Sequence, residues 1–171
     1  MPRVRVQAIV VREGRVLMVS QRHQGHDYWC LPGGALEPGE APQEGALREL
    51  REECNVDGVV VRQTAFALDP CAGDAYSFLV EIGDQQPSLG HDPELAEGKR
   101  GAILLDVQCF HLWEIAERDR AFLWAAGLLS VDDFPSQVEA WGDDPSYPRA
   151  VRKAHPGDPN RTEVLDSTPS P

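Results

Sequence analysis

Several features are scarce in this sequence, and each scarcity excludes a class of protein. The 171 residues contain four cysteines, Cys30, Cys54, Cys71 and Cys109, with no CxxC pair, so neither a zinc site nor a disulfide framework is indicated. Basic residues are also in the minority, with 16 Lys and Arg against 28 Asp and Glu, which gives a formal charge of −12. A protein that holds nucleic acid through its phosphates needs clustered positive charge, so we expect no nucleic-acid partner.

Long apolar runs are missing as well. No run approaches the ~18 residues that a membrane-spanning helix needs, so we expect no membrane partner. The N-terminal stretch MPRVRVQAIVV is interrupted by Arg5 and Gln7, and no small-residue cleavage site follows it, which disfavours a secretion signal. We therefore expect a soluble, cytoplasmic protein with reduced cysteines, long enough for one domain with one core.

The apolar pattern predicts strands before, between and after helices. The glycines, prolines and polar clusters that punctuate the chain predict loops at about 23–34 and 83–100. The absence of regular βαβ alternation favours an α+β fold with a mixed β-sheet packed between helices. The expected elements are strands at about 3–12, 15–22, 58–68, 75–82 and 101–112, a helix at 41–54, and short helices at 113–119 and 120–129.

The C-terminal part of the sequence differs in composition from the rest. From residue 143 onward it is rich in Pro, Ser and Asp and has no periodic apolar pattern. Such a segment cannot bury enough apolar surface to offset the entropy of ordering. We therefore expect one domain at 1–142 and a weakly ordered C-terminal tail at 143–171.

The expected helix at 41–54 carries a cluster of acids. Residues three and four apart share one helical face, so Glu49, Glu52 and Glu53 point the same way. Each close pair of like charges costs about a few tenths of a kcal/mol, so some positive charge should offset them. Neighbouring arginines can neutralise part of the repulsion. A divalent cation can occupy the point where the three carboxylates converge, and Mg²⁺ or Mn²⁺ prefer such oxygen ligands. The alternative interpretation is a solvated acidic helix with a purely structural role.

A segment rich in glycine and proline, LPGGALEPGE, leads into this helix. Gly33, Gly34 and Gly39 free the backbone for tight turns, and Pro32 and Pro38 stiffen the path between them. Such a segment can place a main-chain oxygen beside the carboxylates. Segment and helix together therefore favour a metal site more than either does alone.

The stretch from Gly34 to Val56 resembles the Nudix box of the Nudix hydrolase superfamily. All the charged positions of the box match, and the one departure is Asn55, where the family pattern has glycine. Asn is the non-glycine residue that best tolerates the left-handed conformation with which a helix usually ends, so we expect little functional damage. The matching positions are Gly34, Glu40, Arg48, Glu49, Leu50, Glu52, Glu53 and Val56.

The resemblance implies an α/β/α sandwich around a mixed sheet. It also implies hydrolysis of the pyrophosphate bond in a nucleoside diphosphate linked to another group, with Mg²⁺ as the cofactor and Mn²⁺ as an alternative ion. Sugar nucleotides, dinucleotides and nucleoside triphosphates all stay open as substrates.

The resemblance also implies roles for individual residues. Glu49 would be a metal ligand or the base that acts on water, Arg48 would orient Glu49, and Glu40 would brace the loop against the helix. The metal ligands that it implies are Gly34, through its carbonyl, Glu49, Glu52 and Glu53.

Four residues outside the box are further candidates. Many relatives use an acid from a later loop, and Glu94 in GHDPELAEG is that candidate, with a solvated loop as the alternative. Arg22, at the end of an expected strand, could hold a phosphate or form a surface salt bridge. Tyr28 and Trp29 offer flat faces for a nucleotide base, or anchor their loop by packing.

Two alternative functions would use a similar fold. A nucleotide-sensing module without hydrolysis commonly loses one of the box acids, whereas this chain keeps all of them. An isomerase of isoprenoid diphosphates would need extra metal-binding histidines and a nucleophilic cysteine, and no such set is found. Many relatives pair as dimers, and the apolar helical end could form a subunit contact, so a homodimer is the candidate assembly.

Overall fold

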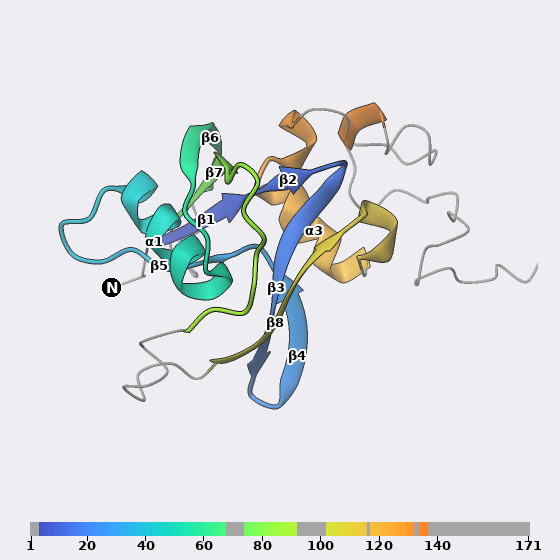
Figure 1. Cartoon of the computed structure of the whole chain (residues 1–171), viewed down its shortest axis with the longest axis horizontal. Coiled ribbons are helices and arrows are strands. Elements are labelled where there is room, and N and C mark those ends of the chain that lie inside the picture. The colour runs from blue at the N-terminus through green and yellow to red at the C-terminus, as the bar shows by residue number, and fades with distance from the viewer. Residues whose placement is uncertain (1–3, 68–73, 92–101, 116, 132–133, 137–171) are drawn as a thin grey trace, which may run out of the picture.

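The computed structural model describes residues 4–67, 74–91, 102–115, 117–131 and 134–136. Figure 1 shows helix α1 on one side of the central strands and helix α3 on the other. The elements are, in chain order, β1 (Arg5–Ile9), β2 (Val11–Arg12), β3 (Arg15–His23), β4 (His26–Cys30), β5 (Gly33–Ala35), α1 (Pro42–Cys54), β6 (Val59–Ala67), β7 (Ala75–Glu81), β8 (Ala102–Phe110), the 3-10 turn η1 (Leu112–Glu114), α3 (Glu117–Ala125) and the 3-10 turn η2 (Leu128–Ser130).

The described strands form two sheets. The first has the order β5-β1-β7-β6, with β1 parallel to β7 and the other pairs antiparallel, so this sheet is mixed. In the second sheet β3 pairs antiparallel with β2, β4 and β8. The α+β class with mixed strands and helices is confirmed, but the strands divide between two sheets where one was expected.

The division falls at Val10, between β1 and β2. The expected strand at 3–12 is therefore two strands, of which β1 joins the mixed sheet and β2 pairs with β3. A turn joins β2 to β3, and in it Glu13 and Gly14 both have positive φ, at 50° and 70°.

The expected loop at 23–34 was wrong. Strand β4 pairs with β3 through a two-residue turn, in which Gln24 has φ 50° and Gly25 has φ 81°. Turns with two positive φ values match the twist of a hairpin. Gly33 to Ala35 then form β5, which pairs with β1. Two-thirds of the presumed loop thus belongs to strands of the two sheets.

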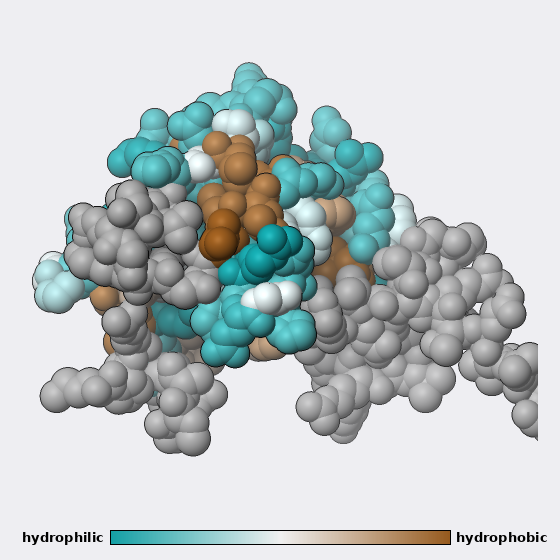
Figure 2. All heavy atoms as spheres, turned by 90° about the horizontal axis from the view of Figure 1, so that it is seen from below, coloured by the Kyte–Doolittle hydropathy of each residue, from teal (hydrophilic) through white to brown (hydrophobic). Residues whose placement is uncertain are grey.

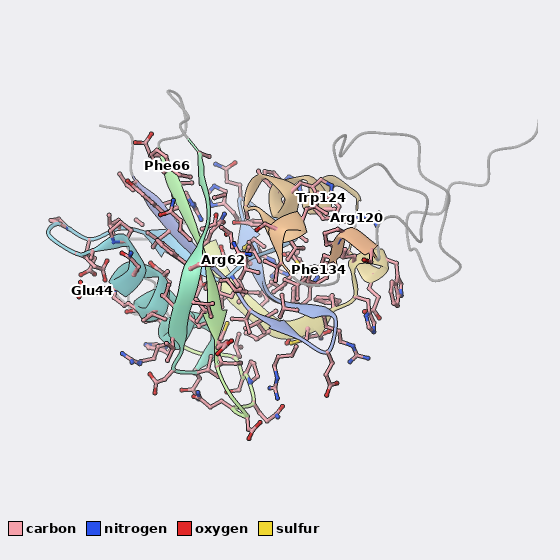
Figure 3. All side chains as sticks on the ribbon, turned by 90° about the horizontal axis from the view of Figure 1, so that it is seen from above. Glu44, Arg62, Phe66, Arg120, Trp124 and Phe134 are labelled. Atoms are coloured by element: carbon pink, nitrogen blue, oxygen red, sulfur yellow. The ribbon has the colours of Figure 1, made fainter. Side chains whose placement is uncertain are left out.

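The helices after β8 also differ from expectation. The expected helix at 113–119 is interrupted at Ile115, which is extended with φ −87° and ψ 131°. Its start lies in the 3-10 turn η1, and its last three residues belong to α3. Helix α3 then covers Glu117–Ala125 and Gly127 ends it in the left-handed conformation with φ 83°. Figure 3 shows Arg120, Trp124 and Phe134 grouped at this end of the molecule, apart from Glu44 on α1.

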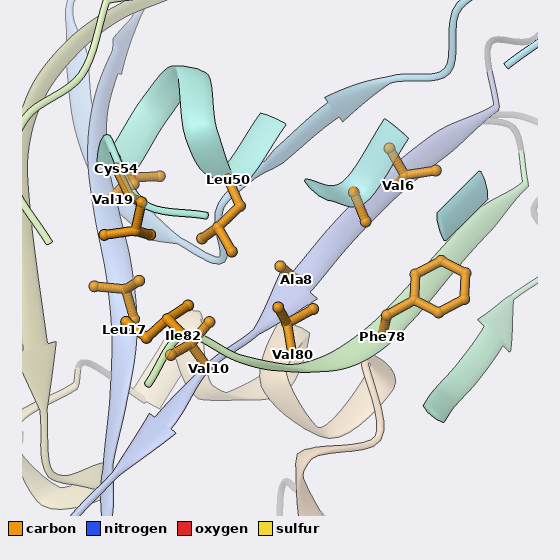
Figure 4. Close-up of a cluster of buried hydrophobic side chains, with 12 residues drawn as sticks. Val6, Ala8, Val10, Leu17, Val19, Leu50, Cys54, Phe78, Val80 and Ile82 are labelled. Atoms are coloured by element: carbon orange, nitrogen blue, oxygen red, sulfur yellow. The ribbon is translucent and has the colours of Figure 1, made fainter. Parts of the chain in front are cut away.

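Strand β3 is buried on both faces because its apolar residues alternate between two cores. Leu17 and Val19 pack toward α1, and Val16 and Met18 pack toward α3. Figure 4 shows the first of these cores, where Leu50 and Cys54 of α1 lie over the strands. Helix α1 is therefore fixed through its apolar face, which leaves its acidic face for the site.

Several expectations fall outside the described residues. The tail at 143–171, Cys71 and the second half of the expected loop, residues 92–100, are among them. The described cysteines, Cys30, Cys54 and Cys109, are free thiols. In the described part of the chain, no helix has the length and apolar character that crossing a membrane requires.

The surface carries some apolar side chains. Figure 2 shows a hydrophobic patch in the middle of the face seen from below. Large apolar side chains that are exposed among the described residues are Val59, Val61, Phe66, Leu89, Ile103 and Phe122. The expected homodimer stays a prediction.

Candidate active site on helix α1

Arg48 is the centre of the site, and all five of its N–H donors are used. Its Nε and Nη2 bind the two oxygens of Glu40 at 2.9 and 3.1 Å. Nη1 donates to Glu49 Oε1 and to Glu52 Oε2, both at 3.0 Å. Nη2 also donates to the Ala35 carbonyl oxygen at 3.0 Å. Since a guanidinium has five donors in a fixed planar fork, this set defines the position of Arg48 completely.

Glu40 ties the segment before the helix to the helix itself. Its Oε2 also accepts a hydrogen bond from the Glu37 N–H at 3.1 Å. The hydrogen bond from Arg48 holds the pKa of Glu40 below its usual value, against the opposing effect of burial. The structure thus brings Glu40 and Arg48 together, as a brace between loop and helix requires.

Glu53 is held from two different strands. Its side chain is 0% exposed, and its Oε1 accepts from Gln21 Nε2 at 2.8 Å while its Oε2 accepts from the Gly33 N–H at 2.9 Å. Gly33 can approach so closely because it has no side chain, and a Cβ there would overlap the Val6 carbonyl oxygen. Both oxygens of Glu53 are therefore held, one by a side chain of β3 and the other by the backbone of β5.

The site is strongly acidic. Arg48 contributes one positive charge against the four carboxylates of Glu40, Glu49, Glu52 and Glu53, so 1 − 4 leaves a formal −3 on these five side chains. Burial lowers the pKa of Arg48, but its hydrogen bond to Glu40 and the charges of Glu49 and Glu52 raise it overall. The last three acids lie in the C-terminal half of α1, where the helix dipole disfavours negative charge. Additional positive charge would therefore stabilise this arrangement.

The donor set has the chemistry of a site for a hard divalent cation. Carboxylate and carbonyl oxygens suit Mg²⁺ and Mn²⁺, and Glu49 and Glu53 are 1% and 0% exposed, so water solvates their charge poorly. Gly34 is buried in β5 next to Gly33, whose N–H contacts Glu53. Within the described residues, no three His, Cys, Asp or Glu side chains converge on one point, and Arg48 holds one oxygen each of Glu49 and Glu52.

The C-terminal end of α1 is closed by a later segment. Asn55 ends the helix in the left-handed conformation, with φ 55° and ψ 38°, as its place in the box predicts. The Ser88 and Gly90 N–H groups donate to the carbonyl oxygens of Cys54 and Glu53 at 3.0 and 2.9 Å. Two of the carbonyls that a helix end leaves without partners are thereby satisfied.

The candidates outside the box have different surroundings. Arg22 forms a salt bridge with Asp27 across the β3–β4 hairpin, at 2.6 and 2.8 Å, and both side chains are about half exposed. Trp29 packs edge-on against Phe110 with ring centroids 4.6 Å apart. Tyr28 donates its hydroxyl to Gln21 Oε1 at 3.2 Å. Glu94 lies outside the described residues.

Sequence reasoning missed four residues that contact the acids or their helix, which are Gln21, Ala35, Ser88 and Gly90. Gln21 is 32 positions from its partner Glu53, and Ala35 is 13 positions from its partner Arg48. Gly90 is 37 positions from its partner Glu53. No local spacing therefore relates these residues to the helix. The only feature of Gln21 in the sequence was that it is a polar residue at the end of an apolar strand. Most of the motif residues, in contrast, lie on α1, with Gly34 on β5 and Glu40 in the segment between these two elements.

Comparisons with known proteins show the family of the chain. The NUDIX domain family model matches residues 1–125, which is most of the chain, so the chain belongs to the NUDIX domain family. The crystal structure of a NUDIX hydrolase from Nitrosomonas europaea is similar, with a TM-score of 0.55 and 26% identity, over 69% of this chain and 62% of that chain.

Two relatives match parts of the chain more closely. A diphosphoinositol polyphosphate phosphohydrolase 3-alpha of Mus musculus is 45% identical over 51 residues, which are 30% of this chain and 30% of that protein. An ADP-sugar pyrophosphatase of Mus musculus is 31% identical over 90 residues, 49% of this chain and 41% of that protein. The matches thus span less than half the length of these curated relatives.

Proposed function

We propose that this protein is a Mg²⁺-dependent Nudix pyrophosphohydrolase, with Mn²⁺ as an alternative ion. Its substrate is a nucleoside diphosphate linked to another group, such as a sugar nucleotide, a dinucleotide or a nucleoside triphosphate. The observation that carries the proposal is that the partly buried guanidinium of Arg48 contacts Glu40, Glu49 and Glu52. Arg48 lies on the helix that also carries the buried Glu53.

The acidity of the site argues for cations. A pyrophosphate adds two or more negative charges to side chains that already carry a formal −3, so the substrate binds only if positive ions lie between the two. Glu49, Glu52, Glu53 and the Gly34 carbonyl are the groups that would hold them. When bound, such ions neutralise the phosphate oxygens and lower the pKa of water.

The remaining chemistry belongs to the side chains. Glu49 is the candidate base, because its carboxylate is desolvated and Arg48 fixes one of its oxygens at 3.0 Å. Arg48 also holds Glu52, and Glu40 holds Arg48, so the two acids keep a fixed distance from each other. Water attacks phosphorus, the oxygen bridging the two phosphates leaves, and Glu49 takes the proton.

The names of the relatives guide the choice of substrates to test. One relative is named for ADP-sugars and another for diphosphoinositol polyphosphates, and all such compounds share a diphosphate. The ADP-sugar match is longer, which supports a nucleotide, but a diphosphoinositol polyphosphate belongs in the same panel.

The direct test is a panel of these compounds with Mg²⁺ or Mn²⁺ in which the products are identified. We expect cleavage of a diphosphate, with release of a nucleoside monophosphate from a nucleotide substrate, and its loss in a Glu52→Gln, Glu53→Gln variant. Binding of nucleotide without cleavage by the wild-type protein would instead indicate a sensing module. No binding and no cleavage in the panel would contradict the proposal.

A further inference from the structure

Gln21 connects strand β4 to the acidic helix. It lies in β3 where the register with β8 shifts, and its side chain is 7% exposed. Its Nε2 donates to Glu53 Oε1 at 2.8 Å, and its Oε1 accepts from the Tyr28 hydroxyl at 3.2 Å. The three residues therefore form a hydrogen-bonded chain from β4 through β3 to α1.

The hydroxyl of Tyr28 selects the orientation of the amide. With the amide as it stands, the NH₂ group faces a carboxylate that can only accept, and the oxygen faces a hydroxyl that can donate. A reversed amide would put its oxygen against the Glu53 carboxylate, and two buried acceptors without a proton between them are costly. Tyr28 thus supports the one orientation in which Gln21 can bind Glu53.

Gln21 and Gly33 together fix the Glu53 carboxylate. One oxygen is held by a side chain of β3 and the other by the backbone of β5, so neither rotation nor translation of the carboxylate is free. Groups that hold a metal ligand in this way commonly set metal affinity as much as the ligand itself does.

We propose that Gln21 is a positioning residue for Glu53 and that Tyr28 acts through Gln21. The inference rests on the proposed function, in which Glu53 is a metal ligand. It also gives Tyr28 a role different from the stacking on a base that its flat ring suggests, because its hydroxyl is committed to the amide.

The test is a double-mutant cycle with Gln21→Leu, Tyr28→Phe and both together. Mn²⁺ binding is measured by calorimetry, and kcat and KM are measured with a substrate identified by the panel. We expect Gln21→Leu to weaken Mn²⁺ binding about 10-fold to 100-fold. Tyr28→Phe should weaken it about 2-fold to 10-fold, as for the loss of one neutral hydrogen bond. The double variant should match Gln21→Leu, since Tyr28 acts through Gln21.

The control is Gln85→Leu. The Gln85 side chain also makes several hydrogen bonds, to the main chain of Asp57 and of Ile82. None of these bonds involves the glutamates of the site. The Gln85→Leu variant should lose thermal stability and keep wild-type Mn²⁺ affinity.

Two further measurements apply to Gln21→Leu. Its kcat should fall more than its KM changes, and amide hydrogen exchange at Gly33 should become faster, because Glu53 is no longer held.

Each other outcome decides against the inference. Wild-type Mn²⁺ affinity in folded Gln21→Leu overturns it, and so do additive losses in the double variant. If Gln21→Leu does not fold, wild-type Mn²⁺ affinity in Tyr28→Phe overturns it. Wild-type protein that binds no Mn²⁺ and cleaves nothing overturns the proposed function as well, so the two failures are distinguishable.

Discussion

The backbone N–H of Gly90 donates to the carbonyl oxygen of Glu53 at 2.9 Å, so a segment after β7 holds the last turn of the acidic helix. A Cβ at Gly90 would overlap the carbonyl oxygen of Glu52, and only glycine fits there without a shift of the main chain. The backbone of two site residues is therefore fixed by a residue that carries no side chain.

Gly90→Ala should displace this turn and both of its acids. We expect a loss of about 1–3 kcal/mol in the free energy of unfolding, as for overpacking, together with reduced hydrolysis. Urea unfolding and steady-state kinetics measure the two effects. Gly83→Ala is the control, because φ there is 59° but nothing lies within 4 Å of a Cβ. Unchanged hydrolysis in a destabilised Gly90→Ala protein would show that the contact serves stability alone.

Arg48→Lys tests the guanidinium. Lysine has three donors on one atom and cannot reproduce contacts to three carboxylates and the Ala35 carbonyl. We expect kcat/KM to fall by about 10-fold to 100-fold, the effect of losing one charged hydrogen bond or more.

Arg51→Lys is the matched control on the same helix. Arg51 pairs with Asp57 at the surface, where both side chains are about two-thirds exposed. This change should leave kcat/KM within about 2-fold, because exposed ion pairs contribute little. Equal effects of the two substitutions would refute a special role for Arg48.

The lowered pKa of Glu40 makes stability depend on pH. A carboxyl group whose pKa is lower in the folded state stabilises the fold above its usual pKa of 4.5, and that contribution is lost as pH falls through the folded value. The difference in unfolding free energy between wild type and Glu40→Gln should therefore be largest near neutral pH and shrink below the usual pKa. Denaturant unfolding at several pH values measures it, with Glu13→Gln, in a turn between two strands, as the control. A difference that does not vary with pH would contradict this role.

The boundaries of the helix could be predicted because the signal is local. Glu49, Glu52 and Glu53 share a face through helical spacing alone, and Asn55 ends the helix as a left-handed residue should. The hairpin turn at Gln24 and Gly25 was missed because nothing in the sequence indicates that a glutamine has a positive φ. The contacts of Gln21 and Gly90 with the helix depend on how strands pair across the chain, which periodicity does not encode.

Leu50→Ala tests how the helix is anchored. Leu50 is fully buried in the core that also contains Val19 and Val80, so truncation leaves a cavity. We expect a loss of about 2–5 kcal/mol in unfolding free energy, whereas Val59→Ala, at an exposed position of β6, should change it by less than about 0.5 kcal/mol. Thermal or urea unfolding checks both. A loss at Leu50 no larger than that at Val59 would mean that the helix is not held by its apolar face.

The proposed function requires that the acidic face of α1 binds divalent cations for a diphosphate substrate. Its most direct test is a calorimetric titration of Mg²⁺ into wild type and into Glu53→Gln, in the presence of a nucleotide whose diphosphate bridge cannot be hydrolysed. The account predicts saturable Mg²⁺ binding to the wild type and a loss of about 10-fold or more in affinity in the variant. Equal Mg²⁺ binding by the two proteins, or none by either, would contradict it.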